Sequence, residues 1–151
     1  MSDGPTDSRR RFEGSCHCGA VTFTFETAVP PARWQTRACQ CTFCRRHAAR
    51  TISDHEGSVA FRVDEAALQR YRFGLGTAEF FVCRNCGVYL AAVLTSARGQ
   101  FATLNINALR DPVDVESPVK VSYDRESVDE RQRRREEGWT PVREIAITSG
   151  P

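Results

Sequence analysis

The sequence predicts a mainly β domain that is stabilised by bound metal ions and has few short helices. Two observations support this fold class. Short segments in which apolar and polar residues alternate recur along the chain, whereas helix-compatible segments are few. All seven cysteines fall into three tight groups, and such groups are typical of zinc sites. A length of 151 residues fits one domain, and a hydrophobic fraction of 40% allows a modest core.

The chain is expected to divide into a tail, a domain and a C-terminal extension. Residues 1–11 are polar and lack aromatic side chains, so they are predicted to form a disordered tail. They also lack the apolar segment of a secretion signal, which predicts a reducing, cytoplasmic location. The zinc-binding domain is expected over residues 12–123, and a charged helix and tail over residues 124–151. No apolar run approaches the length needed to cross a membrane.

Strands are predicted where short apolar segments alternate with polar residues. In residues 20–26, for example, Val21 and Phe25 share one face and Thr22 lies on the other, as in a half-buried strand. The predicted strands are residues 20–26, 33–37, 57–63, 79–82, 88–94 and 100–106.

Two short helices are predicted between these strands. One covers residues 43–49 and places Cys44 near a helix start, where the helix dipole favours a thiolate. The other covers residues 64–69, with Asp64 as its N-cap.

A third helix, rich in charged residues, is predicted over residues 125–137, and Trp139 is expected to anchor it on the domain. The basic run at residues 131–135 could form a binding patch, but its acidic neighbours favour a solvated helix. With a net charge of +2 and no basic patch interleaved with aromatic residues, the chain is not expected to bind nucleic acid. The segment after Asp124 is therefore expected to serve packing.

The cysteines are better explained by zinc than by disulfides. Their number is odd, and a C-x-C pair is poorly placed for a mutual disulfide. Four thiolates would close one structural zinc site, and three would leave a second zinc with an open position, as in catalytic sites. Spacing alone does not decide whether the last group combines with the first or with the middle one. The groups are Cys16 and Cys18, then Cys39, Cys41 and Cys44, then Cys83 and Cys86.

Four segments carry a likeness to a known family: GSCHCGAV at 14–21, CQCTFCRR at 39–46, YRF at 71–73 and CRNCG at 83–87. In the order and internal spacing of its cysteines the chain resembles the glutathione-dependent formaldehyde-activating enzyme family, which also includes centromere protein V. The resemblance implies a two-layer β fold around a zinc ribbon. It also implies two Zn²⁺ sites: a closed, structural one from Cys16, Cys18, Cys83 and Cys86, and an open one from Cys39, Cys41 and Cys44.

The resemblance further implies a zinc-dependent carbon–sulfur lyase that acts on a glutathione–aldehyde adduct such as S-hydroxymethylglutathione. A thiol substrate at the open zinc would lose its proton, so the three cysteines of the middle group are the catalytic candidates. Arg45 and Arg46 are candidates for binding substrate carboxylates, and the alternative for them is a solvated surface. The sequence departs from the family at Gln40, where histidine is common.

The alternative function is a non-catalytic zinc module that binds a protein or nucleic-acid partner. It requires a closed second site, in which His47 or His55 would replace water or a substrate thiol as the fourth ligand. Cys83 and Cys86 could also form a free redox pair.

Overall fold

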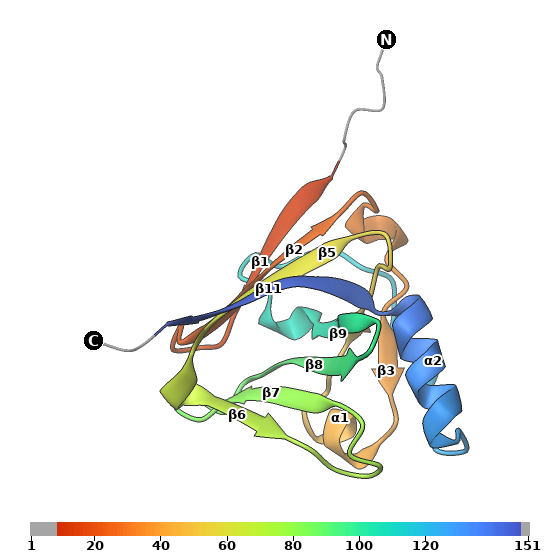
Figure 1. Ribbon diagram of the computed structural model, residues 1–151. Coiled ribbons are helices and arrows are strands. Elements are labelled where there is room, and N and C mark those ends of the chain that lie inside the picture. The colour runs from red at the N-terminus through yellow and green to blue at the C-terminus, as the bar shows by residue number, and fades with distance from the viewer. Residues whose placement is uncertain (1–8, 149–151) are drawn as a thin grey trace.

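The computed structural model describes residues 9–148 and shows a mainly β protein, as predicted. Its strands form one branched, mixed sheet that folds into two layers (Figure 1). Two α-helices, α1 (Thr42–Arg46) and α2 (Val128–Gly138), lie at one end of these layers, and three single 3₁₀ turns interrupt the connections. The 3₁₀ turns are η1 (Pro31–Arg33), η2 (Glu65–Ala67) and η3 (Ile106–Ala108).

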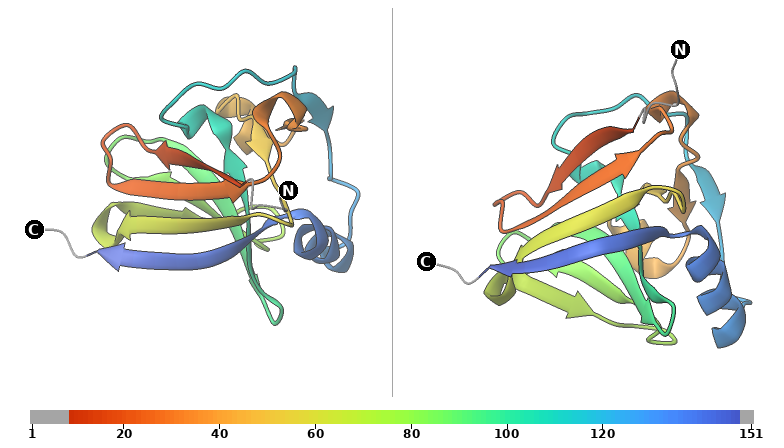
Figure 2. Two further views of the ribbon diagram at one scale, coloured as in Figure 1. Left: turned by 90° about the horizontal axis from the view of Figure 1, so that it is seen from above. Right: turned by 45° about the horizontal axis from the view of Figure 1, so that its top comes forward.

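The first layer combines strands from the two ends of the described chain. It consists of β1 (Arg10–Ser15), β2 (Val21–Thr27), β5 (Ser58–Asp64) and β11 (Thr140–Thr148), in that order. The first three strands pair antiparallel, whereas β11 lies parallel to β5, with Ile145 opposite Phe61 (Figure 2). A bulge between Val142 and Glu144 shifts the register within β11.

The second layer is an antiparallel meander with an extension. The meander consists of β6 (Leu68–Tyr71), β7 (Glu79–Cys83), β8 (Tyr89–Ser96) and β9 (Gly99–Asn105). The free edge of β9 pairs with β11 through Thr140 and with β4 (Thr51–Ile52) through Thr51. From β4 the sheet continues through β3 (Arg37–Cys39) to β10 (Val119–Val121). Thus β11 belongs to both layers.

The larger hydrophobic core lies between the two layers. Val21, Phe23 and Phe25 of β2 and the inward residues of β5 meet Phe81 of β7, and each of these side chains is almost fully buried. Burying one such side chain stabilises a fold by roughly 1.5–3 kcal/mol. The alternation predicted for residues 20–26 and 57–63 is therefore confirmed.

A second core covers the outer face of the meander. Phe80, Tyr89, Leu94 and Phe101 lie on this face, and Trp139 at the end of α2 packs against them. Because both of their faces are covered, β8 and most of β9 are buried along nearly their whole length. The strands expected over residues 88–94 and 100–106 are present, and the docking of Trp139 on the domain is confirmed.

Three short predicted elements differ from the structure. The strand expected over 33–37 is wrong, because Pro31 begins a 3₁₀ turn and the strand starts only at Arg37. The first helix ends at Arg46, since Ala48 adopts a positive φ of 49°. The helix expected over 64–69 is a single 3₁₀ turn, which Asp64 caps as predicted, because the chain enters β6 at once.

The two ends of the described chain are more ordered than the sequence predicts. A disordered tail over residues 1–11 is wrong for Arg10 and Arg11, which pair with Thr27 and Glu26 in the sheet; residues 1–8 lie outside the described residues. After Trp139 no strand was expected, but β11 follows directly. Within residues 9–148, no helix is both long and apolar enough to cross a membrane.

Candidate functional site

The first and last cysteine groups form a four-thiol cluster. Cys16 and Cys18 lie in the turn from β1 to β2, and Cys83 and Cys86 lie at the turn from β7 to β8. The Sγ atoms of Cys16 and Cys18 are 3.8 Å apart, those of Cys18 and Cys83 are 3.6 Å apart, and all four lie within 4.8 Å of one another. Four thiolates around a tetrahedral zinc at about 2.3 Å have sulfur–sulfur separations of roughly 3.8 Å. The donor atoms therefore fit a zinc ion.

The backbone around this cluster favours thiolates. Gly87 adopts a φ of 80° and its N–H donates to the Cys83 carbonyl, which closes the tight turn expected beneath a metal. Burial raises the pKa of Cys83 to about 12. Burial also acts to raise the pKa of Cys86, but N–H groups, among them that of Val88, and neighbouring thiols outweigh it and lower this pKa to about 6. A divalent cation bound by such a cluster takes the place of the thiol protons.

The middle cysteine group forms a three-thiol cluster on the opposite face of the meander. Cys39 ends β3, Cys41 is the N-cap of α1, and Cys44 lies in the first turn of that helix, with Sγ atoms within 4.8 Å of one another. The Sγ of Cys41 accepts the N–H of Cys44 at 3.4 Å, so a thiol takes the place of the usual capping oxygen.

In the three-thiol cluster the thiolate form is favoured at Cys41 and disfavoured at Cys39 and Cys44. Hydrogen bonds from the thiols of Cys39 and Cys44 lower the pKa of Cys41 to about 2. The hydrogen bond with Cys41 is the chief cause of the raised pKa of Cys39, and the hydrogen bond with Cys39, followed by that with Cys41, is the chief cause of the raised pKa of Cys44. The expectation that the start of the helix favours a thiolate at Cys44 is wrong, because hydrogen bonds with the neighbouring thiols raise the pKa of Cys44; the thiolate is favoured instead at Cys41, the N-cap.

Neither candidate histidine joins the three-thiol cluster. The ring of His47 packs on Phe43, with the ring centroids 4.5 Å apart. His55 lies with its Nδ1 3.3 Å from the Trp139 carbonyl and stacks on Phe101. Among the residues that the structure describes, the cluster consists of three cysteines and no fourth ligand.

The three thiols open into a cavity of about 480 Å³, a size typical of sites for small ligands. Aromatic side chains, including Phe80 and Tyr89, line one part of it. Burial raises the pKa of Tyr89 well above its usual value, so its hydroxyl stays protonated. The charged lining residues are Arg37, Asp124, Glu126, Arg131, Arg134 and Arg135.

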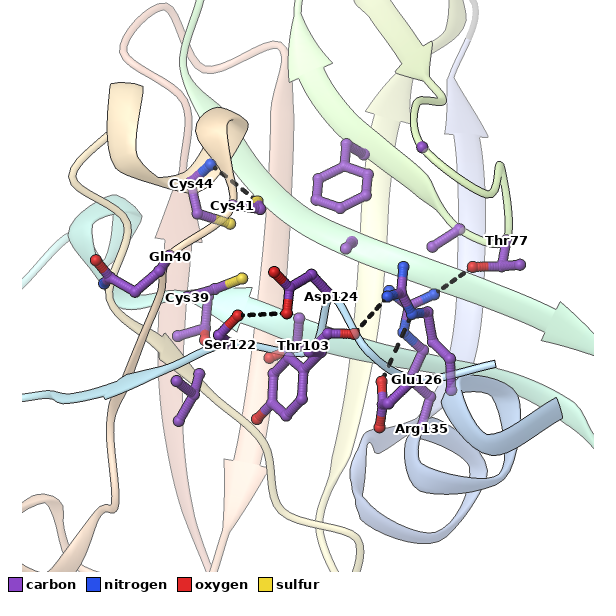
Figure 3. A pocket seen from close by; sticks show the side chains of 18 of the residues that line it. Cys39, Gln40, Cys41, Cys44, Thr77, Thr103, Ser122, Asp124, Glu126 and Arg135 are labelled. Carbon is purple, nitrogen blue, oxygen red and sulfur yellow. Dashed lines mark hydrogen bonds and ion pairs between the residues drawn. The ribbon is translucent and has the colours of Figure 1, made fainter. Parts of the chain in front are cut away.

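The polar wall of the cavity comes largely from α2 and the segment before it. Figure 3 shows the cysteines on one side of the cavity and Thr77, Glu126 and Arg135 on another. Glu126 accepts two hydrogen bonds from Arg134, at 2.7 and 2.9 Å, and lies 3.5 Å from the Nε of Arg131. The segment after Asp124, which was expected to serve packing, therefore also lines the cavity; whether it takes part in chemistry stays a prediction.

The arginines predicted to bind substrate lie elsewhere. Arg45 and Arg46 are exposed at the end of α1, and neither lines the cavity. Their role in substrate binding stays a prediction. Sequence reasoning missed Arg135, although a signal exists: Arg131, Arg135 and Trp139 are spaced by four residues, which places them on one face of a helix.

Comparisons with known proteins agree with the order and spacing of the cysteines. The sequence model described as "Glutathione-dependent formaldehyde-activating enzyme" matches residues 11–125, a span that contains all seven cysteines. No curated protein matches the sequence. A crystal structure of a Rhodobacter sphaeroides protein, a structural-genomics target, is 29% identical and has a TM-score of 0.54; the match covers 72% of this chain and 99% of that one. The chain belongs to the glutathione-dependent formaldehyde-activating enzyme family.

Proposed function

We propose that the protein is a zinc-dependent carbon–sulfur lyase that forms and cleaves the bond between a thiol and an aldehyde. Glutathione and formaldehyde are the pair that the family description indicates. One observation carries the proposal. The three-thiol cluster lacks a fourth ligand among the described residues and opens into a cavity large enough for a small substrate. A purely structural zinc site would be closed.

The donor atoms of both clusters suit zinc. Thiolates are the ligands that select zinc over harder divalent ions, and the four-thiol cluster has the required spacing. Cys39, Cys41 and Cys44 would hold the reactive ion, and the four-thiol cluster would hold a structural one. When bound at the open cluster, zinc supplies a positive charge that favours the thiolate form of a substrate thiol.

The proposed reaction needs no oxidant or reductant. The sulfur of the substrate thiolate shares an electron pair with the aldehyde carbon, and a carbon–sulfur bond forms. The carbonyl π electrons move to oxygen, which takes up the equivalent of the proton that the thiol released, giving an S-hydroxymethyl product. Cleavage reverses these steps. Phe80 and Tyr89 reduce the access of water to this space, because their rings line the cavity beside the cysteines.

X-ray absorption at the zinc edge, with and without glutathione, tests the proposal. Glutathione is expected to add a sulfur neighbour to one of two zinc ions and to accelerate adduct formation with formaldehyde over the spontaneous rate. Cys44→Ser should abolish both effects, and Arg133→Gln, on the exposed side of α2, should preserve them. Unchanged absorption together with an unchanged rate would reject the lyase and favour a non-catalytic zinc module.

A cytoplasmic location is part of the proposal. It is supported by the seven cysteines, none of which forms a disulfide in the structure, because a reducing compartment keeps clustered thiols available for metal.

A further inference from the structure

In the part of the chain that the structure describes, Arg135 is a buried cation that forms no ion pair with a carboxylate. Its exposed fraction is 8%, although it lies on a helix with an otherwise polar surface. Nη1 donates to the Thr77 hydroxyl at 2.8 Å, and the guanidinium lies 4.7 Å from the centroid of the Trp139 ring. Nε is buried and has no hydrogen-bond partner. Among the described residues, no acidic side chain lies within ion-pair distance of Arg135.

The other arginines of the cavity are already partnered. Arg134 forms the two hydrogen bonds to Glu126 and stacks over Tyr123, at 3.5 Å from its ring centroid. Arg131 donates to the Tyr123 carbonyl at 2.6 Å; its Nε, like that of Arg135, is buried without a hydrogen bond, but it lies 3.5 Å from Glu126 and so has an ion-pair partner. Arg37 donates to the hydroxyl groups of Ser53 and Tyr123. Glu126 thus pairs with Arg131 and Arg134, and within residues 9–148 no carboxylate forms an ion pair with Arg135.

The surroundings of Arg135 suit an anion. Four arginines and two carboxylates line the cavity, so its wall is positive overall. Burial, followed by the charges of Arg134 and Arg131, lowers the pKa of Arg135 to about 10, which still leaves the side chain protonated at neutral pH. A buried charge is costly unless it is paired, and a planar guanidinium matches a carboxylate through two parallel hydrogen bonds.

We propose that Arg135 is a substrate-binding residue whose guanidinium pairs with a carboxylate of the thiol substrate. The substrate thus spans the cavity, with its sulfur at Cys39, Cys41 and Cys44 and its carboxylate at α2 (Figure 3). The inference rests on the proposed function for the identity of the ligand. It adds a residue that lies beyond the family match, which ends at residue 125, and it sets the specificity of the site for thiols that carry a carboxylate.

Thr77 and Trp139 fix the orientation of this guanidinium. The hydroxyl of Thr77 holds Nη1, and the ring of Trp139 supports the guanidinium from the side. With the group held in place before a ligand arrives, little side-chain entropy is lost on binding.

Two probes that cannot add a thiolate to zinc test the inference by calorimetry on the zinc-loaded protein. S-methylglutathione keeps both carboxylates, and its diethyl ester lacks them. The wild type is expected to bind the acid about 10- to 100-fold more tightly than the ester, as charged hydrogen bonds of this kind contribute. Arg135→Gln should remove that preference and leave binding of the ester unchanged. Arg135→Lys should retain part of it, and the exposed Arg133→Gln should retain all of it.

The outcomes separate this inference from the proposed function. Equal binding of acid and ester by the wild type, or no binding of either, overturns the role of Arg135 without using any variant. An unchanged preference in Arg135→Gln overturns it as well, even if glutathione alters the zinc absorption edge. If neither the absorption edge nor the rate of adduct formation responds to glutathione but the preference depends on Arg135, the lyase is rejected and the carboxylate site stands.

Discussion

At the scale of single residues, the four-thiol cluster connects the two layers of the sheet. Cys16 and Cys18 follow β1 in the first layer, and Cys83 and Cys86 bound the turn after β7 in the second. The three-thiol cluster, in contrast, is contained within residues 39–44. A metal in the first cluster therefore constrains the fold far more than a metal in the second.

Cys86→Ser is expected to remove about one zinc per chain and to lower the free energy of unfolding by several kcal/mol, because structural zinc contributes directly to folding. Cys44→Ser is the matched control: it should also remove about one zinc but lower the melting temperature much less. Metal analysis and thermal unfolding measure both effects. A Cys86→Ser protein that keeps its zinc and its melting temperature would contradict the assignment of Cys86 as a ligand.

Gly14→Ala is expected to destabilise the protein by about 1–3 kcal/mol, the usual cost of overpacking. Gly14 faces Phe23 across the β1–β2 pair, and an added Cβ would overlap the buried Phe23 ring. Gly138→Ala is the control, since its Cβ would meet nothing within 4 Å. Urea unfolding of the two variants compares them. Equal stabilities would show that Phe23 can move aside at no cost.

The two cysteine clusters could be predicted from the sequence, but the polar wall of the cavity could not. Cysteines that could bind one metal ion are separated by only one or two residues within each group, so the groups can be recognised in the sequence alone. The likeness to the family then indicated that the first group combines with the last. Arg135 depends on how α2 folds back over the meander, which no local pattern specifies. Arg45 and Arg46 were predicted to bind substrate because they follow Cys44 directly. Both lie in the last turn of α1, where they are exposed and do not line the cavity.

At the scale of elements, α2 is fixed at both ends. Ser127 and Glu130 form a reciprocal capping box at its start, and Trp139 is buried at its end. Glu126, just before the helix, holds Arg134 and Arg131 against the cavity wall. The position of the cavity arginines therefore depends on a few contacts at the beginning of this helix.

Glu126→Gln is expected to destabilise the protein by about 1 kcal/mol at neutral pH, as a partly buried ion pair does. Its hydrogen bonds with Arg134 hold the Glu126 pKa below its usual 4.5. Because the pKa of Glu126 is lower in the folded than in the unfolded protein, the ion pair stabilises the fold fully above pH 4.5. This stabilisation is lost as the pH falls through the pKa of Glu126 in the folded protein. The difference between wild type and variant should thus shrink below pH 4.5. Unfolding curves across this pH range check it, and a constant difference would contradict the role of the pair.

Strands without a bulge, such as β2 and β9, were predictable from the sequence, whereas β11, which contains a bulge, was not. In β2 the alternation is uninterrupted, so the strand and its buried face were both correct. In β11 the bulge between Val142 and Glu144 breaks the two-residue period, and Val142 and Ile145 pack against the same core although they are three residues apart. The pattern of this strand cannot be recognised without its partner.

At the scale of the whole molecule, β11 joins the two layers. It pairs with β5 over most of its length and with β9 through Thr140 and Pro141. The hydroxyl of Thr140 also accepts the N–H of Asp54, at the turn that leads into β5. Removing this strand would leave edges on both layers, and exposed edges favour aggregation.

Deletion of residues 125–151 is expected to abolish cooperative unfolding, because it removes β11 and Trp139 together. Near-ultraviolet circular dichroism and the shape of the thermal transition measure this loss. Ser127→Ala is the milder control: it removes only the helix cap and should cost about 1 kcal/mol. A truncated protein that melts cooperatively would show that the remaining strands suffice for the fold.

The place of β11 also determines the order in which the protein matures on the ribosome. Hydrogen bonds of Thr140 and Thr148 join residues that are 86 and 85 positions apart, so they close only after most of the chain has been translated. The four-thiol cluster is complete in sequence at Cys86, well before β11 at Thr140–Thr148, so its thiols leave the ribosome while the edges of β5 and β9 that pair with β11 are still unpaired. A metal ion bound early at this cluster would therefore protect a nascent chain with unpaired strand edges. If the cluster holds zinc as proposed, zinc shortage during synthesis should lower the yield of folded protein.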